Sequence, residues 1–453
     1  MSAREVWKRE LVALTRLAIP VVLSELGWMA LGVVDTIMVG KLGPVAIGAV
    51  ALGNAVFYTP SLFGIGLLLG LDPLVSQAYG RRDYDDCHRW LAQGIYLAFG
   101  VTPVLMLLIG AASVFFTRVG ITPEVAAPAA QYLRILVWSL LPLLIYAASR
   151  RYLQGVSQMR VIPLTYVGAN LINWIGNWVL IYGHWGFPAM GVRGSALSTV
   201  VARILMAASL LGFAWRYERK RGHPLFRHWA GVQLDRIRQL IRIGLPAAGQ
   251  IVLEVGAWNT ATLSAGWLNP ISLATHQIAI NYASITYMIP LGVSAATSVS
   301  VGHAIGAGDK ARARRAGWLA LGLGTAFMVL AGIIFFMAPR PLIELYTHDP
   351  QVLAVGPSLL WIAAAFQVFD GVQTVCTGAL RGLGETRAPM IANFVGYWLL
   401  GLPLGLILCF ILKWGIYGMW IGLTLALIVI STTLLLRWHK ESKHLVEAYS
   451  PTK

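Results

Sequence analysis

Residues 17–43 are LAIPVVLSELGWMALGVVDTIMVGKLG, an apolar run that holds only two acidic side chains, Glu25 and Asp35. A helix of about 20 apolar residues is long enough to cross the hydrocarbon core of a bilayer. The most apolar part of this run, 17–37, therefore predicts a membrane-spanning helix. It is too long for the apolar core of a cleavable signal peptide, and further apolar runs follow it.

Eleven more runs of this kind follow along the chain. The sequence is 57% hydrophobic and 12% charged, with a mean hydropathy of +0.68, whereas a soluble domain carries about 25% charged residues. We therefore expect an all-α membrane protein rather than a soluble one. The twelve predicted spans are 17–37, 46–71, 91–116, 130–149, 161–182, 194–215, 243–266, 273–299, 316–338, 354–380, 388–412 and 415–436.

The basic residues predict the orientation of these spans. The net charge is +16, yet the Lys and Arg residues lie in short loops and not on one element, as nucleic-acid binding would require. Of the 35, 28 lie in the two termini and every second loop, five lie in the alternate loops, and Arg134 and Arg203 lie within spans. Because cytoplasmic loops are enriched in Lys and Arg, we expect both termini in the cytoplasm and the protein in the inner (plasma) membrane.

The chain also predicts two related halves. A shift of 226 residues aligns Pro20 with Pro246, Pro44 with Pro270, Gly66 with Gly292 and Asp83 with Asp309. The expected domains are 1–215 with six spans, a cytoplasmic linker at 216–242, and 243–453 with six spans and a basic tail. Two parallel six-helix repeats predict pseudo-symmetric bundles with the substrate cavity between them.

Acidic residues inside spans predict the functional site. A charge within the bilayer is costly and calls for a role, and Asp35, Glu254 and Asp370 all lie within predicted spans. Asn170, Asn173 and Asn177 share one helical face because their spacing is i, i+3, i+7. We expect this face near Asp35, with Thr199 adding a hydroxyl, as a site for H⁺ or Na⁺. Helix packing through hydrogen bonds is the alternative role of these residues.

Other candidates are fewer. Pro20 is a candidate hinge, because proline frees a backbone carbonyl and permits bending. His276 and His303 have no acidic or cysteine partner at ligand spacing, the three cysteines are far apart, and no phosphate-binding glycine loop is present. The sequence therefore predicts no enzyme, no cofactor and no direct use of ATP, which favours coupling to an ion gradient.

Several motifs resemble the multidrug and toxic compound extrusion (MATE) family, in particular its NorM-like branch. They are the opening run 17–43, QAYG at 77–80, ATHQIAINYASITYMIPLGVSAATSVSVGHAIGAGD at 274–309 and GALRGLGETR at 378–387. The resemblance implies a V-shaped pair of six-helix lobes. It also implies an N-lobe cation site at Asp35, Asn173, Asn177 and Thr199, and a C-lobe site at Glu254 and Asp370.

The sequence departs from the family at two positions. Some relatives carry a second carboxylate where Asn177 stands, so Asp35 remains the main acid of that lobe. NorM-like relatives can carry Tyr where Phe366 stands, and the loss of that hydroxyl weakens the expectation of Na⁺ at Glu254 and Asp370.

The resemblance implies a monomeric exporter of drug-like, often cationic compounds in exchange for H⁺ or Na⁺, with no nucleic-acid partner. One alternative is a flippase for a lipid-linked precursor, whose cavity often carries several arginines. Another is an intramembrane enzyme, for which Glu254 and Asp370 are the candidate catalytic pair.

Overall fold

A computed structural model describes residues 3–114, 116, 122–223, 225 and 231–447, and these form helices and connecting turns without a strand. The helices of the first half are α1 (Ala3–Gly40), α2 (Pro44–Leu68), α3 (Leu71–Gly80), α4 (Tyr84–Val114), α5 (Pro123–Leu136), η1 (Val137–Ser139), α6 (Leu140–Gly155), α7 (Val161–Tyr182) and α8 (Val192–Lys220). Those of the second half are α9 (Leu234–Leu268), α10 (Pro270–Gly306), α11 (Lys310–Met337), α12 (Pro339–Glu344), α13 (Pro350–Gly382), α14 (Arg387–Asn393), η2 (Phe394–Gly401), α15 (Leu402–Leu406), η3 (Ile407–Ile411) and α16 (Ile416–Glu447).

Each of the twelve predicted spans overlaps one of these helical segments. Within the described residues, eleven segments are long and apolar enough to cross a membrane. The remaining predicted span, 161–182, coincides with α7, a 22-residue helix whose three asparagines lower its hydropathy. The prediction of an all-α membrane protein is confirmed.

The chain divides into two compact units. Each unit includes one segment, called an arm below, from the other half of the sequence: residues 1–22 in unit 1 and the start of α9, up to Ala248, in unit 2. Unit 1 comprises Met1–Val22 and Gly249–Lys453, and unit 2 comprises Leu23–Ala248. The units therefore differ from the predicted domains 1–215 and 243–453 at these two arms, because α1 and α9 each run unbroken from one unit into the other. Residues 234–242, expected in a linker, are already part of α9.

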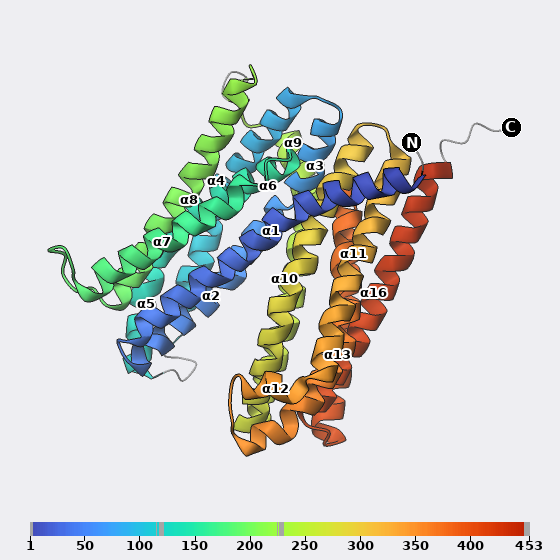
Figure 1. The fold of residues 1–453 in the computed structure, drawn as a ribbon. Coiled ribbons are helices and arrows are strands. Elements are labelled where there is room, and N and C mark those ends of the chain that lie inside the picture. Colours follow the sequence, from blue (N-terminus) through green and yellow to red (C-terminus); the bar gives the residue numbers. More distant parts are fainter. Residues whose placement is uncertain (1–2, 115, 117–121, 224, 226–230, 448–453) are drawn as a thin grey trace. The chain divides into compact units, whose positions relative to one another are not determined.

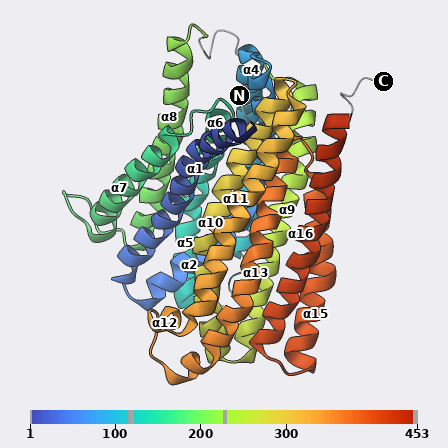
Figure 2. The same cartoon turned by 45° about the vertical axis from the view of Figure 1, so that its right-hand side comes forward.

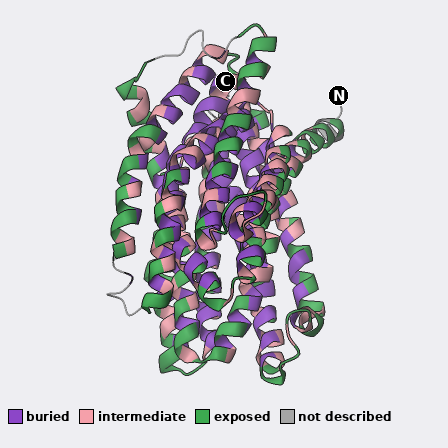
Figure 3. Ribbon diagram, turned by 90° about the vertical axis from the view of Figure 1, so that its left-hand side faces the viewer, coloured by how far each residue is buried: buried purple, intermediate pink, exposed green. Residues whose placement is uncertain are grey.

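Unit 2 is a bundle of the second half of α1, α2 to α8 and the start of α9. Its buried cluster includes the aromatic rings of Phe57, Tyr132, Tyr152 and Tyr166. In Figure 3 the helices carry buried residues along one side and exposed residues along the other. This pattern fits helices that face lipid on one side and neighbouring helices on the other.

Unit 1 is built around α10, α11, α13 and α16, which run side by side in the views of Figure 1 and Figure 2. Its buried cluster includes Trp420 and Trp438, and also Leu14 and Ala18 from the first arm. The same arm is held by Arg315 of α11, whose Nε and Nη2 donate to Glu10 at 3.0 to 3.3 Å.

The helix boundaries follow the predicted repeat. Pro44 and Pro270 begin α2 and α10, and Asp83 and Asp309 each accept a hydrogen bond from the amide three residues later, at 2.9 Å. The unit boundaries follow the same repeat. Helix α1 passes from unit 1 to unit 2 after Val22, and α9 passes from unit 2 to unit 1 after Ala248, which is 226 residues later.

A glycine marks a close helix crossing in each unit. A Cβ on Gly66 of α2 would come within 2.5 Å of the Cα of Ala248, and one on Gly292 of α10 would come within 2.9 Å of the backbone N of Val22. Real Cβ atoms do not approach other atoms this closely, so each crossing needs a residue without a side chain. The two crossings are equivalent under the repeat and involve the last residue of each arm.

Candidate functional site

Asp35 lies on α1, five residues before the helix ends at Gly40, and only 5% of its surface is exposed. Its Oδ1 accepts a hydrogen bond from Nδ2 of Asn177 at 2.7 Å. Its Oδ2 lies 3.2 Å from the hydroxyl of Thr199. Both partners are neutral, so the carboxylate is buried among dipoles and not in a direct ion pair.

The asparagine face of α7 divides between two environments. Asn173 and Asn177 are fully buried, and Nδ2 of Asn177 also lies 3.2 Å from Oδ1 of Asn173. Nδ2 of Asn173 lies 3.4 Å from the Thr199 hydroxyl. Asn170 instead donates to the backbone carbonyl of Gly27 at 3.0 Å. The structure thus brings together the four residues predicted for this site, and Asn170 serves helix packing.

Arg203 extends the site, although sequence reasoning had noted it only as an arginine within a span. It lies one turn after Thr199 on α8, is 4% exposed and donates to the hydroxyl of Ser139 at 2.6 Å. Its guanidinium also lies over the ring of Phe57, 4.7 Å from the centroid. A permanent positive charge therefore lies close enough to act on Asp35 without bonding to it.

A second buried ion pair joins α1 to α6. Arg150 and Glu25 are paired, and their side chains are 9% and 15% exposed. The expectation that Arg150 lies in a loop is wrong, because α6 continues to Gly155 and Arg150 is buried within it. The basic pair in SRRYLQG suggests a loop, and only the partner in a distant span, 125 residues away, explains its burial.

Unit 1 holds the other two acids. Glu254 of α9 accepts a hydrogen bond from Nδ2 of Asn393 at 3.4 Å. Asp370 of α13 is 5% exposed and lies close enough to Glu254 for their charges to interact. The hydroxyl groups of Tyr287 and Tyr397 are in the same neighbourhood. Neither tyrosine was predicted as a site residue, and no motif in the sequence distinguishes them from packing aromatics.

Phe366 lies one turn before Asp370 and faces an aromatic cluster. Its ring centroid is 5.3 Å from that of Trp258 and 5.7 Å from that of Trp420. The indole of Trp420 donates to Nδ1 of His276 at 3.1 Å, and Nε2 of that histidine lies 2.9 Å from the Thr262 hydroxyl. An indole can only donate, so Nδ1 must be the acceptor and His276 is a neutral, fully bonded residue of this cluster.

Pro20 lies inside α1, which continues as one helix to Gly40. It stands two residues before the point at which α1 leaves unit 1, and Pro246 has the same place in α9 before Ala248. Each proline is therefore next to the end of its arm, where a helix that changes direction would bend.

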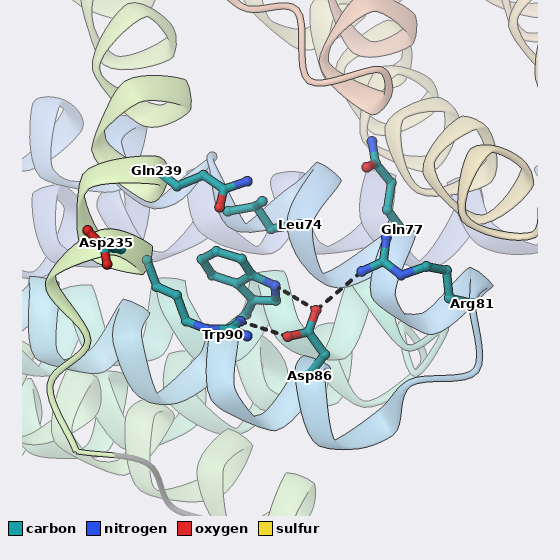
Figure 4. A pocket seen from close by; sticks show the side chains of 8 residues that line it. Leu74, Gln77, Arg81, Asp86, Trp90, Asp235 and Gln239 are labelled. Carbon is teal, nitrogen blue, oxygen red and sulfur yellow. Dashed lines mark hydrogen bonds and ion pairs between the residues drawn. The ribbon is translucent and has the colours of Figure 1, made fainter.

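A polar pocket of about 380 Å³ lies in unit 2 where α3, α4 and α9 meet. Figure 4 shows Asp86 between Arg81 and Trp90. Asp86 accepts from Arg81 at 3.2 Å and from the indole of Trp90 at 3.1 Å, and it pairs with Arg236 at 2.7 Å. Because these charges are paired with one another, we interpret the cluster as the attachment of the second arm to unit 2.

The comparisons with known proteins agree with this organisation. The MatE family model matches the chain twice, over residues 20–179 and 246–407, with the two matches starting 226 positions apart. The chain is 37% identical over 449 residues to a probable multidrug resistance protein NorM of Mesorhizobium japonicum, covering 98% of this chain and 96% of that protein. It is 34% identical to the multidrug resistance protein NorM of Burkholderia vietnamiensis, covering 97% and 96%.

Solved structures share the fold. The eukaryotic MATE transporter AtDTX14 matches with a TM-score of 0.85 at 24% identity, covering 98% of this chain and 99% of that one. A MATE protein in a bent conformation matches with a TM-score of 0.88 at 19% identity, covering 97% of each chain. At these identities the likeness concerns the arrangement of helices alone.

Proposed function

Since the chain belongs to the MatE family and is therefore a transporter and not an enzyme, we propose that it exports drug-like, often cationic organic compounds in exchange for H⁺ or Na⁺ by alternating access. We place it in the inner membrane as a monomer with both termini in the cytoplasm. The relatives named above, described as multidrug resistance proteins, support the class of cargo.

The observation that carries the proposal is the environment of Asp35. Its carboxylate is buried against Asn177 and Thr199, which supply hydrogen bonds but no charge. Burial of an ionised carboxylate without a direct ion-pair partner is costly, even with Arg203 nearby. Uptake of one cation at Asp35 removes this cost, so occupancy of the site favours one conformation of the transporter over the other.

H⁺ and Na⁺ would use the same side chains differently. A proton on Oδ2 of Asp35 would be donated to the oxygen of Thr199, whose own hydroxyl proton then goes to the carbonyl of Ser195, 3.0 Å away. A sodium ion would instead take oxygen ligands from Asp35, Thr199 and the side-chain carbonyl of Asn177, to which no described residue donates a hydrogen bond. Glu254 and Asp370 form a second candidate site, because two carboxylates that act on each other favour uptake of a cation.

A lipid-linked flippase is the second candidate function, and the buried arginines weigh against it. Arg150 is paired with Glu25, and Arg203 donates to Ser139 and stacks on Phe57. Binding a polyanionic headgroup calls for arginines that are available to it, and these two are already engaged within unit 2.

The test is efflux of a fluorescent cationic dye from proteoliposomes under an imposed pH gradient or an imposed Na⁺ gradient. We expect one gradient to drive transport and Asp35→Asn to abolish it. The control is Glu124→Gln, which neutralises an exposed acid at the start of α5. Full transport by Asp35→Asn would overturn the role of Asp35, and failure of both gradients with several dyes would redirect the search to lipid-linked cargo.

A further inference from the structure

An apolar groove runs along the outer surface of unit 2 between α4 and α5. Its volume is about 540 Å³, and its lining includes Leu107, Gly110 and Ser113 from α4, and Arg134, Val137 and Trp138 from α5 and η1. Leu107 is 74% exposed and Trp138 is 68% exposed. These side chains lie on helices that cross the membrane, so the groove faces lipid.

Among the described residues that line this groove, Arg134 is the one that carries a charge. It is exposed, and within the described part of the chain it makes no hydrogen bond or ion pair. An arginine within the membrane is costly and is usually paired or directed to an aqueous cavity. In the same unit Arg150 is paired with Glu25, and the buried Arg203 donates to Ser139, whereas Arg134 has no counter-charge among the described residues.

The position of Arg134 along α5 indicates which leaflet supplies that charge. It lies eleven residues after Pro123, where α5 begins, which is about 17 Å along the helix at 1.5 Å per residue. Helical side chains point toward the N-terminus of their helix, and a long arginine side chain extends its charge toward the interface. We therefore expect the guanidinium to lie toward the headgroups at the Pro123 end, with Val137 and Trp138 farther along the chain from that end.

We propose that this groove binds an anionic phospholipid, with its phosphate on Arg134 and an acyl chain along Leu107 and Trp138. A guanidinium binds a phosphate through two parallel hydrogen bonds. The described residues that line the groove include no acidic side chain, so the amine of a zwitterionic headgroup finds no partner among them, whereas a negatively charged headgroup supplies the missing charge. The site is separate from the Asp35 cluster, whose residues do not line it.

The test measures lipid binding by native mass spectrometry of the full-length, delipidated protein in detergent. Short-chain phosphatidylglycerol is titrated against phosphatidylcholine of the same chain length. We expect phosphatidylglycerol to bind more tightly and Arg134→Gln to weaken it about tenfold, the value of a lost charge-assisted hydrogen bond. The control Arg193→Gln removes an exposed arginine at the start of α8, outside the groove, and should bind like the parent protein.

A second variant fills the groove and leaves Arg134 in place. A Cβ on Gly110 would meet no atom within 4 Å, so Gly110→Phe displaces no neighbour at its Cβ and we expect it to fold. We expect it to weaken phosphatidylglycerol binding as strongly as Arg134→Gln. Equal binding of the two lipids, or unchanged phosphatidylglycerol affinity in either variant, would overturn the proposal.

Discussion

Thr199 has one hydroxyl proton and two acceptors within reach, Oδ2 of Asp35 at 3.2 Å and the carbonyl of Ser195 at 3.0 Å. It can donate to only one of them at a time. When Asp35 is ionised, the Thr199 hydroxyl donates to its carboxylate. When Asp35 is protonated, the hydroxyl can donate to the carbonyl of Ser195 instead. A single side chain can therefore respond to the charge of its neighbour without moving far.

This arrangement predicts different results for two substitutions at Thr199. Thr199→Val keeps the shape but removes the hydroxyl, and we expect about a tenfold loss of apparent affinity for the coupling cation, since hydrogen bonds to charged groups contribute about 1.5–3 kcal/mol. Thr199→Ser keeps the hydroxyl and should retain most activity. Dye efflux at varied pH or Na⁺ concentration measures both. Equal activity of the two variants would contradict a role for the hydroxyl.

The pair Glu25–Arg150 makes a prediction about stability. Removing one partner leaves the other buried without a counter-charge, which typically costs about 3 kcal/mol or more. We expect Glu25→Gln to lower the free energy of unfolding by about that amount, as measured by chemical denaturation in detergent. The double variant Glu25→Leu with Arg150→Met should recover most of the loss. If the double variant loses as much stability as Glu25→Leu and Arg150→Met lose separately when added together, Glu25 and Arg150 are not energetically coupled.

At the residue scale, the site could be predicted from the sequence where one helix carried the pattern. The i, i+4 spacing of Asn173 and Asn177, with an acid on another apolar span, was enough to predict their meeting with Asp35. Prediction failed where the partner lies far along the chain, as for Arg150. It also failed for Tyr287 and Tyr397, because in an apolar helix nothing distinguishes a tyrosine near acids from one in ordinary packing.

At the scale of elements, the two glycine crossings set how closely helices approach. A methyl group at Gly66 or Gly292 would overlap the neighbouring helix, and overpacking a tight contact costs about 1–3 kcal/mol. We expect Gly66→Ala and Gly292→Ala each to lower the melting temperature in detergent by several degrees. Gly168→Ala on α7 is the control, because a Cβ there meets nothing within 4 Å. If all three variants have the same melting temperature, the helices at Gly66 and Gly292 are not in tight contact.

The eleventh span shows what periodicity in an apolar sequence does not reveal. The prediction was one helix over 388–412, and the structure has α14 and α15 with π-helical turns in η2 and η3. A Cβ on Gly401 would come within 2.6 Å of the Cβ of Ala426 in α16, and one on Gly405 would approach Met419 at 3.0 Å. The wider turns accompany this close packing, and a span that is apolar on all sides carries no stripe to predict it.

At the scale of the whole molecule, the duplication was predictable but the exchange of arms was not. The shift of 226 came from Gly and Pro residues, and the same shift relates the two family matches and the two unit boundaries. The long hydrophilic stretch 216–242 pointed to a division there. Hydrophobicity alone does not show that α1 and α9 are each shared between units, because both sides of such a helix are apolar.

The shared helices predict how the protein behaves when it is cut. A break between Gly222 and His223, both exposed, leaves the first fragment without residues 234–248 of unit 2 and the second without residues 1–22 of unit 1. We expect neither fragment to accumulate alone and the two to co-purify when co-expressed. Removing residues 1–22 from the first fragment should weaken co-purification. If the second fragment is equally stable whether or not the first fragment carries residues 1–22, the assignment of this arm to unit 1 is wrong.

The arm of residues 1–22 is synthesised long before the part of unit 1 that it contacts. Glu10 and its partner Arg315 are 305 residues apart, so at ribosomal rates of about 5–20 residues per second the arm waits roughly 15–60 s for that partner. During this interval the arm lacks the residues of α10 to α16 with which it packs in unit 1. Any delay in translating the second half lengthens the period in which cellular proteases meet an unfinished protein.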